Sequence, residues 1–302
     1  MQTVSIFQTV GVVGTGAMGR GIAQMAAQAG SQVRLFDQQP GAADAARSAL
    51  ADVWDKLVAK GRMTPDARDA CLAGLRLAGA LGELAGCNLV VEAIVEKLDV
   101  KQRLFAELEA VVSAEAVLAT NTSSLSVTAI GAALKAPQRL AGFHFFNPVP
   151  LMRVVEVIAG LKTSPAVCQQ LTDFTRQFGH TPVSAQDTPG FIVNHAGRGY
   201  GTEALRVAGE RVADFATIDR ILRDQMGFKL GPFELMDLTA LDVSHPVMES
   251  IYRQYYDEPR YRPSVITAQR LAGGVVGKKA GEGFYAYDNG VAVVPVEPPA
   301  PE

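Results

Sequence analysis

The sequence is poor in cysteine, histidine and tryptophan, with three, four and one of them in 302 residues. Cys71, Cys87 and Cys168 are scattered, and no Cys-x-x-Cys or Cys/His cluster is present. This usage predicts reduced thiols in a cytoplasmic protein, and it argues against a disulfide framework or a bound metal.

Basic excess and long apolar runs are also missing. The formal net charge is −3, so the charge balance does not favour nucleic acid or an anionic membrane surface as a partner. No apolar run approaches the roughly 18 residues that span a bilayer. The first residues do not combine a basic segment with a long apolar one, which argues against a signal peptide. The length of 302 residues allows two ordinary domains.

A glycine turn near the N-terminus is the first positive signal. Residues 9–13 are apolar and largely β-branched, as in a buried parallel strand, and the G-x-G-x-x-G spacing follows at once. In such a turn the first glycine permits the tight bend, the second lets the backbone approach a pyrophosphate, and the third lets helix and strand pack closely. The helix that begins there presents free N–H groups to phosphates. The predicted phosphate-binding residues are Gly14, Gly16, Ala17, Met18 and Gly19.

An acidic residue follows at the distance expected for a dinucleotide site. Asp37 ends a second predicted strand, eighteen residues after Gly19. A carboxylate there binds the adenine ribose hydroxyls and repels a 2′-phosphate, so NAD is favoured over NADP as the cofactor. The alternative is a polar residue that merely ends a strand, and the glycine turn favours the cofactor interpretation.

A helical hairpin is predicted over about 41–74, before the third strand. Its second helix starts with Thr64 as N-cap and Pro65 in the first turn. The hairpin is either extra scaffold or a flap whose basic residues, such as Lys60, meet a substrate's phosphates. The residues alone favour scaffold.

Polar side chains follow the next two predicted strands. Glu96 comes just after a buried strand at 89–94, and Asn121 and Ser123 come after the strand that contains Ala119. Ligands of open parallel sheets bind beyond the carboxyl ends of the strands. These residues are therefore expected where the nicotinamide end of the dinucleotide lies.

The stretch "GFHFFNPVPLMRVVEV" places a histidine and a carboxylate in two apolar runs separated by prolines. If the runs pair antiparallel about Pro150, His144 faces Glu156, and opposite Cβ atoms lie about 4.5–5.5 Å apart. A carboxylate there orients an imidazole and stabilises its protonated form, which suits a general base that works near neutrality. The alternative is a buried histidine bonded to a backbone carbonyl.

The remaining sequence predicts a second, helical domain. We expect a dinucleotide-binding domain over 1–187, an all-helical domain over 188–290 that forms a dimer interface, and a proline-rich tail or linker over 291–302. Because a chain rarely ends on a linker, the sequence is interpreted as one part of a longer protein. Asn194, near the start of the first long helix, is either a surface residue or a hydrogen-bond donor to a substrate carbonyl.

These features together resemble the short-chain L-3-hydroxyacyl-CoA dehydrogenase family over about residues 8–288. The matching motifs are "GVVGTGAMGRGIA", "VVEAIVE", "NTSSLSVT", "GFHFFNPVPLMRVVEV", "DTPGFIVN", "GPFELMDL" and "GKKAGEGFY". Within the family, the chain is most similar to the bacterial 3-hydroxybutyryl-CoA and 3-hydroxyadipyl-CoA dehydrogenases. The resemblance implies an α/β fold: a Rossmann-type doubly wound sheet with antiparallel strand additions and an inserted helical hairpin, followed by an all-helical C-terminal domain.

The resemblance also implies an activity and the residues for it. The activity is NAD-dependent, reversible oxidation of (S)-3-hydroxyacyl-CoA in fatty acid β-oxidation. His144 is then the base, Glu156 supports it, and Ser123 and Asn194 hydrogen-bond the substrate oxygen. Asp37 holds the ribose. The positions that match other cofactor-contacting residues are Glu96, Lys101, Ser123, Asn147 and Lys279.

The hairpin resembles the family's CoA-binding flap, which reverses the scaffold preference and makes Lys60 a substrate-binding candidate. Two positions depart from the family pattern: Val53 replaces a serine used by some relatives, and His195 replaces a common arginine. Two other functions compete with a CoA-thioester dehydrogenase, namely a dehydrogenase for free 3-hydroxy acids and a redox-silent NAD-binding protein. The intact set of His144, Glu156, Ser123 and Asn194 disfavours both.

Overall fold

The computed structural model describes residues 5–293, and the chain divides into two compact units between Phe191 and Ile192. The sequence predicts this boundary slightly earlier, after residue 187. Each unit has its own hydrophobic core, and each is described by itself below.

The first unit is built on a sheet of eight strands in the order β3-β2-β1-β4-β5-β6-β7-β8. Strands β1 to β6 are parallel, β7 runs antiparallel to β6, and β8 is parallel to β7. This confirms the predicted doubly wound sheet with antiparallel additions. The strands are β1 (Thr9–Val13), β2 (Gln32–Phe36), β3 (Leu75–Leu77), β4 (Leu89–Glu92), β5 (Val117–Thr120), β6 (Leu140–Phe145), β7 (Val154–Ala159) and β8 (Thr181–Gln186).

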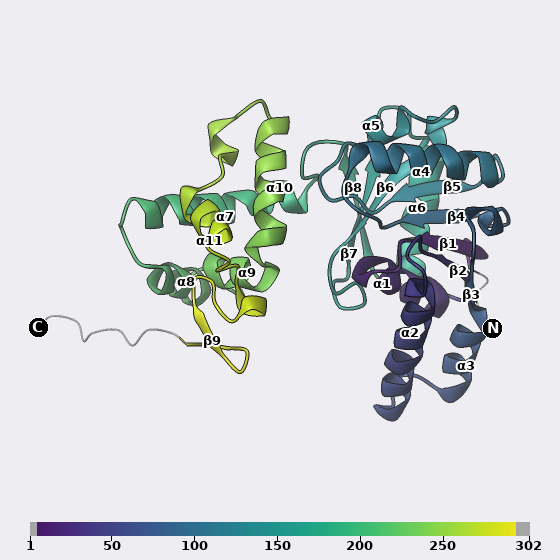
Figure 1. The fold of residues 1–302 in the computed structure, drawn as a ribbon, viewed down its shortest axis with the longest axis horizontal. Coiled ribbons are helices and arrows are strands. Elements are labelled where there is room, and N and C mark those ends of the chain that lie inside the picture. Colours follow the sequence, from purple (N-terminus) through teal and green to yellow (C-terminus); the bar gives the residue numbers. More distant parts are fainter. Residues whose placement is uncertain (1–4, 294–302) are drawn as a thin grey trace, which may run out of the picture. The chain divides into compact units, whose positions relative to one another are not determined.

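Helices cover both faces of this sheet (Figure 1). Alternate strand residues point to opposite faces, so Val12 packs with α1 and α6 while Val90 packs with α4 and α5. Both faces are therefore apolar, as parallel sheets require. The helices of this layer are α1 (Ala17–Gln28), α4 (Leu98–Val111), α5 (Val127–Gly131) and α6 (Pro165–Gln177), with short 3₁₀ turns η1 (Leu81–Leu84) and η2 (Pro137–Arg139).

The predicted helical hairpin is present as α2 (Ala42–Ala59) and α3 (Pro65–Gly74), which pack together beside β3. Thr64 is the N-cap of α3, and its hydroxyl accepts a hydrogen bond from the backbone N–H of Ala67 at 3.2 Å. Trp54 and Leu50 anchor α2 in the core, since neither side chain is more than 1% exposed. The two helices project from the β1–β3 end of the sheet (Figure 1).

The second unit is mainly helical, and its helices surround a small core that includes Phe233 and Leu241. Two of its helices, α9 and α10, meet at Ala240, whose φ of +65° separates them. The elements are α7 (Val193–Gly209), α8 (Phe215–Asp224), α9 (Pro232–Thr239), α10 (Leu241–Gln254), η3 (Pro259–Tyr261), α11 (Val265–Ala272) and η4 (Lys278–Ala280).

Two buried aspartates tie the last part of this unit to its helices. Asp237 accepts hydrogen bonds from the backbone N–H groups of Phe284 and Tyr285, and Asp219 accepts one from the Tyr285 hydroxyl at 2.7 Å. Burial raises the pKa of both carboxyl groups, although these hydrogen bonds oppose the shift. These hydrogen bonds attach the segment after α11, around Phe284 and Tyr285, to helices α8 and α9.

The second unit is not wholly helical, because β9 (Ala286–Asp288) and β10 (Val291–Val293) form an antiparallel hairpin. Residues 291–293, which the sequence assigns to the tail, are strand. Residues 294–302, which include most of the predicted proline-rich linker, lie outside the described part of the chain. Within residues 5–293 no helix is both long enough and apolar enough to cross a bilayer.

Candidate active site

The glycine turn between β1 and α1 requires glycine at two positions and leaves open space at a third. Gly14 has φ +88°, and a Cβ there would lie 2.5 Å from the carbonyl oxygen of Ala93. A Cβ on Gly19 would lie 1.8 Å from the carbonyl oxygen of Gly14. A Cβ on Gly16 would meet nothing within 4 Å. The open space at Gly16, next to the first turn of α1, fits a phosphate group.

Asp37 lies just beyond β2 and is fixed by the same turn. Its carboxylate accepts hydrogen bonds from the backbone N–H and the hydroxyl of Thr15, at 2.7 and 2.8 Å, and from the N–H of Gln39 at 3.0 Å. Burial favours the neutral form, but these hydrogen bonds outweigh it and lower the pKa of Asp37. A charged carboxylate is therefore held at the edge of the turn.

A cleft of about 880 Å³ opens at this place, and its lining includes Gly14, Gly16, Asp37, Ile94 and Leu104. Its lining includes residues at the carboxyl ends of β1 and β4, the neighbouring strands at which the strand order reverses direction. Open α/β sheets bind ligands at this switch point. The turn, the carboxylate and the cleft together fit a dinucleotide.

His144 and Glu156 face each other across β6 and β7, in the register that the sequence predicts. Nδ1 of the ring lies 2.7 Å from Oε2 of the carboxylate, and the two residues are 4% and 0% exposed. The rings of Phe146 and Phe191 lie next to the imidazole, with centroid distances of 4.5 and 5.7 Å. A carboxylate at Nδ1 fixes a proton there and leaves Nε2 to exchange a proton with a ligand.

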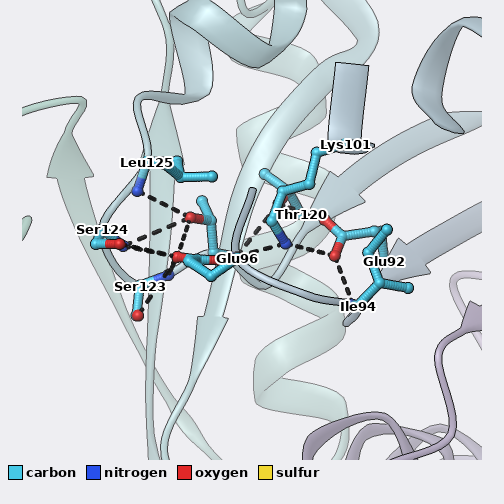
Figure 2. Close-up of polar contacts among 9 residues, drawn as sticks. Glu92, Ile94, Glu96, Lys101, Thr120, Ser123, Ser124 and Leu125 are labelled. Atoms are coloured by element: carbon cyan, nitrogen blue, oxygen red, sulfur yellow. Dashed lines mark hydrogen bonds and ion pairs between the residues drawn. The ribbon is translucent and has the colours of Figure 1, made fainter. Parts of the chain in front are cut away.

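The loop that follows β5 carries Ser123 and is organised by Glu96 (Figure 2). Oε1 of Glu96 accepts hydrogen bonds from the Thr122 hydroxyl at 2.6 Å and from the N–H groups of Ser123 and Ser124 at 2.8 and 3.1 Å. Partial desolvation of the carboxyl group would raise its pKa, but the nearby Lys101 charge and these hydrogen bonds outweigh it and lower the pKa of Glu96.

Two further residues complete this region: Asn121, which the sequence placed near the nicotinamide end without a specific contact, and Glu92, to which it gave no role. Asn121 joins the loop to β6, because its Oδ1 accepts a hydrogen bond from the N–H of Phe145, next to His144, at 2.9 Å. Glu92, at the end of β4, is fully buried and lies 2.5 Å from Nζ of Lys101. A charged residue inside the apolar run at 89–94 is the one signal that could have singled out Glu92.

The other predicted site residues are distributed as follows. Asn147 is exposed just after β6, and Lys60 is exposed at the end of α2. Lys101 is 1% exposed, and its ammonium lies between the carboxylates of Glu92 and Glu96. The remaining two belong to the second unit: Asn194 lies in the first turn of α7, and Nζ of Lys279 is 2.6 Å from Oδ2 of Asp242.

His195, where the sequence departs from the family pattern, is bonded through both ring nitrogens. Nδ1 lies 2.9 Å from the hydroxyl of Tyr255, and Nε2 lies 3.2 Å from the hydroxyl of Tyr261. The two tyrosine rings stack at 4.7 Å. His195 thus joins α7 to the end of α10 and to η3.

Among residues 5–293, no group of three or more His, Cys, Asp and Glu side chains could hold a metal ion.

A sheet of this strand order, with a glycine turn and an acidic residue at its switch point, defines the first unit as a dinucleotide-binding domain of the Rossmann class. Comparison with protein families narrows the class. Residues 9–188 match the NAD-binding domain of 3-hydroxyacyl-CoA dehydrogenase, and residues 190–287 match its C-terminal domain. The chain therefore belongs to the 3-hydroxyacyl-CoA dehydrogenase family, and its cofactor is NAD.

Individual relatives agree with this assignment. The chain is 43% identical to the 3-hydroxyadipyl-CoA dehydrogenase of Escherichia coli over 93% of its own length, and it spans 59% of that protein. It is 40% identical to a probable 3-hydroxybutyryl-CoA dehydrogenase of Deinococcus radiodurans, covering 92% of this chain and 99% of the relative. A crystal structure of an (S)-3-hydroxybutyryl-CoA dehydrogenase from Ralstonia eutropha matches with a TM-score of 0.90 at 34% identity, over 93% of this chain and 99% of the other.

Proposed function

We propose that this protein catalyses the reversible, NAD-dependent oxidation of (S)-3-hydroxyacyl-CoA thioesters to 3-oxoacyl-CoA. The observation that carries the proposal is the buried His144–Glu156 pair, with 2.7 Å between Nδ1 and Oε2, in a domain that also holds a dinucleotide cleft. Relatives named as 3-hydroxyacyl-CoA dehydrogenases match the chain over more than nine-tenths of its length.

His144 is the general base of the proposed reaction. Because Nδ1 is bonded to Glu156, the ring accepts the proton of the 3-hydroxyl group at Nε2. The resulting imidazolium is stabilised by the buried carboxylate, which offsets the cost of forming a charge among the rings of Phe146 and Phe191. When bound, NAD supplies the hydride acceptor. In the reverse direction His144 returns the proton to the substrate oxygen.

Ser123 and Asn194 bind the substrate oxygen in this proposal. Glu96 and the bond from Phe145 to Asn121 fix the loop that contains Ser123, which supports a defined position for its hydroxyl group. Asn194 is in the first turn of α7 in the second unit. An oxygen that receives hydrogen bonds develops negative charge at lower cost as its proton leaves.

The cofactor contacts proposed for this chain start from the glycine turn. Gly14, Gly16, Ala17, Met18 and Gly19 hold the phosphates, and Asp37 holds the adenine ribose, as the open space at Gly16 and the fixed carboxylate support. Glu96 and Ser123 border the nicotinamide end. Lys101, Asn147 and Lys279 are further contacts by their match to family positions.

The α2–α3 hairpin is the proposed binding flap for the CoA moiety. Lys60 is exposed at the end of α2 and would meet the CoA phosphates. Val53, where some relatives have serine, is half-buried on the same helix. The identity of the acyl chain is left to assay, because the relatives include both 3-hydroxybutyryl-CoA and 3-hydroxyadipyl-CoA enzymes.

A homodimer formed through the helical unit is part of the proposal. Several large apolar side chains of this unit are exposed within the single chain, and a partner subunit would cover them. They are Ile221, Met226, Phe228, Leu235, Leu238 and Val243.

A cytoplasmic location remains a prediction from cysteine usage, and all three cysteines are free thiols.

The proposal is tested by comparing substrates that differ in the configuration at C3 or in the presence of the CoA thioester. Purified protein is supplied with NAD and with (S)-3-hydroxybutyryl-CoA, its (R) enantiomer, or free 3-hydroxybutyrate, and NADH formation is followed. Turnover of the (S) thioester alone is expected. Equal turnover of the free acid would instead identify a dehydrogenase for free 3-hydroxy acids, and NAD binding without turnover of any substrate would identify a redox-silent protein.

A further inference from the structure

Glu92 is a charged residue in a position that favours an apolar one. It lies at the end of the central strand β4, is 0% exposed, and has apolar Val91 before it in the strand. Its carboxylate accepts hydrogen bonds from the N–H of Ile94 at 2.7 Å and from the hydroxyl of Thr120 at 2.8 Å. A buried ion pair contributes little net stability compared with apolar residues of similar size. We therefore look for a role of Glu92 other than stabilising the fold.

The partner of Glu92 is Lys101 on α4, which is 1% exposed. Its Nζ lies 2.5 Å from Oε1 of Glu92 and 3.2 Å from Oε2 of Glu96. One ammonium group thus joins a fully buried carboxylate to a carboxylate whose side chain is 35% exposed (Figure 2). Glu92 belongs to β4 and is hydrogen-bonded to Thr120 on the neighbouring strand β5, so its position is fixed. The ammonium group of Lys101, which is paired with it, is therefore fixed as well.

The two oxygens of Glu96 have different partners. Oε2 faces Lys101, whereas Oε1 accepts the hydrogen bonds from the loop after β5, including the N–H groups of Ser123 and Ser124. A carboxylate is rigid and planar, so fixing one oxygen fixes the direction of the other. Glu96 thus links Lys101, 3.2 Å away, to the loop after β5.

We propose that Glu92 and Lys101 are positioning residues for Ser123: they hold Glu96, and Glu96 holds the loop that presents the Ser123 hydroxyl to the substrate oxygen. The importance of Ser123 rests on the proposed function, whereas the alignment of the loop does not. In this proposal Lys101 acts on the loop through Glu96.

The test removes the buried charges together, since removing one would leave the other unpaired. In Glu92→Gln/Lys101→Met, the glutamine oxygen can still accept from Ile94, while both charges are gone. The control is Glu109→Gln, which removes one charge from a second, largely buried ion pair on the same helix and so reports what the loss of such a charge does away from the loop. Glu109 lies 3.6 Å from Arg139, and the two side chains are 11% and 8% exposed.

The first readout is hydrogen exchange of the Ser123 and Ser124 amides in the protein without cofactor. We expect at least about a tenfold faster exchange in the double variant and none of this change in Glu109→Gln. The second readout is the separation of kcat from KM. We expect kcat to fall by about 10- to 100-fold with a much smaller change in KM, because a misplaced group costs mainly transition-state stabilisation.

Unchanged exchange of both amides in a folded double variant would overturn the proposal. If the double variant does not fold, Glu92→Gln alone decides through the same amides, and exchange no faster than in Glu109→Gln would again overturn it. If the wild-type protein turns over no CoA thioester, the proposed function fails, but the exchange comparison still decides whether Glu92 and Lys101 align the loop.

Discussion

Replacing Glu156 by glutamine isolates the contribution of a single charge to the proposed base. The two side chains have the same shape, so no cavity forms at this fully buried position. Nδ1 of His144 keeps a potential acceptor in the glutamine oxygen, but the imidazolium formed in the reaction no longer faces a carboxylate at 2.7 Å. The variant therefore tests electrostatic support rather than packing.

The expected loss follows from the strength of this bond. A hydrogen bond to a charged group contributes about 1.5–3 kcal/mol, and a neutral one contributes roughly half as much. Because glutamine keeps a neutral bond, the loss is the difference, about 0.75–1.5 kcal/mol. Since each 1.4 kcal/mol or so corresponds to a tenfold change in rate, kcat should fall by about 3- to 13-fold. His144→Ala removes the base itself and should cost more, about 10²- to 10⁴-fold.

The assay measures kcat, KM and NADH binding for wild type, Glu156→Gln, His144→Ala and the control Glu109→Gln, which changes a carboxylate away from the site. NADH binding should be unchanged in all four proteins, and only the first two variants should lose kcat. A Glu156→Gln protein with wild-type kcat, or with a raised KM and unchanged kcat, would refute the role of the pair.

Three further predictions concern the cofactor site and acid stability. Gly19→Ala should lower the free energy of unfolding by about 3 kcal/mol, because the added Cβ would meet the Gly14 carbonyl. Gly16→Ala, where the Cβ meets open space, should have the urea midpoint of wild type but should bind NADH at least about tenfold more weakly. Asp37→Asn should narrow the preference for NADH over NADPH, measured as the ratio of kcat/KM, since the repelling charge is gone. The pKa values of Asp37 and Glu96 are lowered in the folded protein, so their contribution to stability is present above about pH 4 and is lost as the pH falls through the folded values. Urea midpoints measured from neutral to acidic pH should therefore fall in that range, and less so for Asp37→Asn.

Local sequence signals predicted the parts of the site that depend on spacing along the chain. The glycine turn and Asp37 lie on one short strand-turn-helix-strand unit, so their relation is set by neighbouring residues. The pairing of His144 with Glu156 was also predictable, because the prolines after residue 147 place the bend and antiparallel register then fixes the partners.

Relations between distant segments were not predictable in the same way. The hydrogen bond from Thr120 to Glu92 joins residues on neighbouring strands, and the residue pattern of neither strand predicts it. The same holds for Asp219 and Asp237, which bind the chain near Tyr285, and for the break between α9 and α10 at Ala240. Each depends on tertiary packing, which overrides local preference.

The most direct test of the central claim is NADH oxidation with acetoacetyl-CoA, measured beside free acetoacetate and with NADPH in place of NADH. The account predicts rapid loss of NADH absorbance with the thioester, little with the free acid, and little with NADPH. Comparable rates with free acetoacetate, or no oxidation of NADH by a protein that binds it, would contradict the assignment as a 3-hydroxyacyl-CoA dehydrogenase.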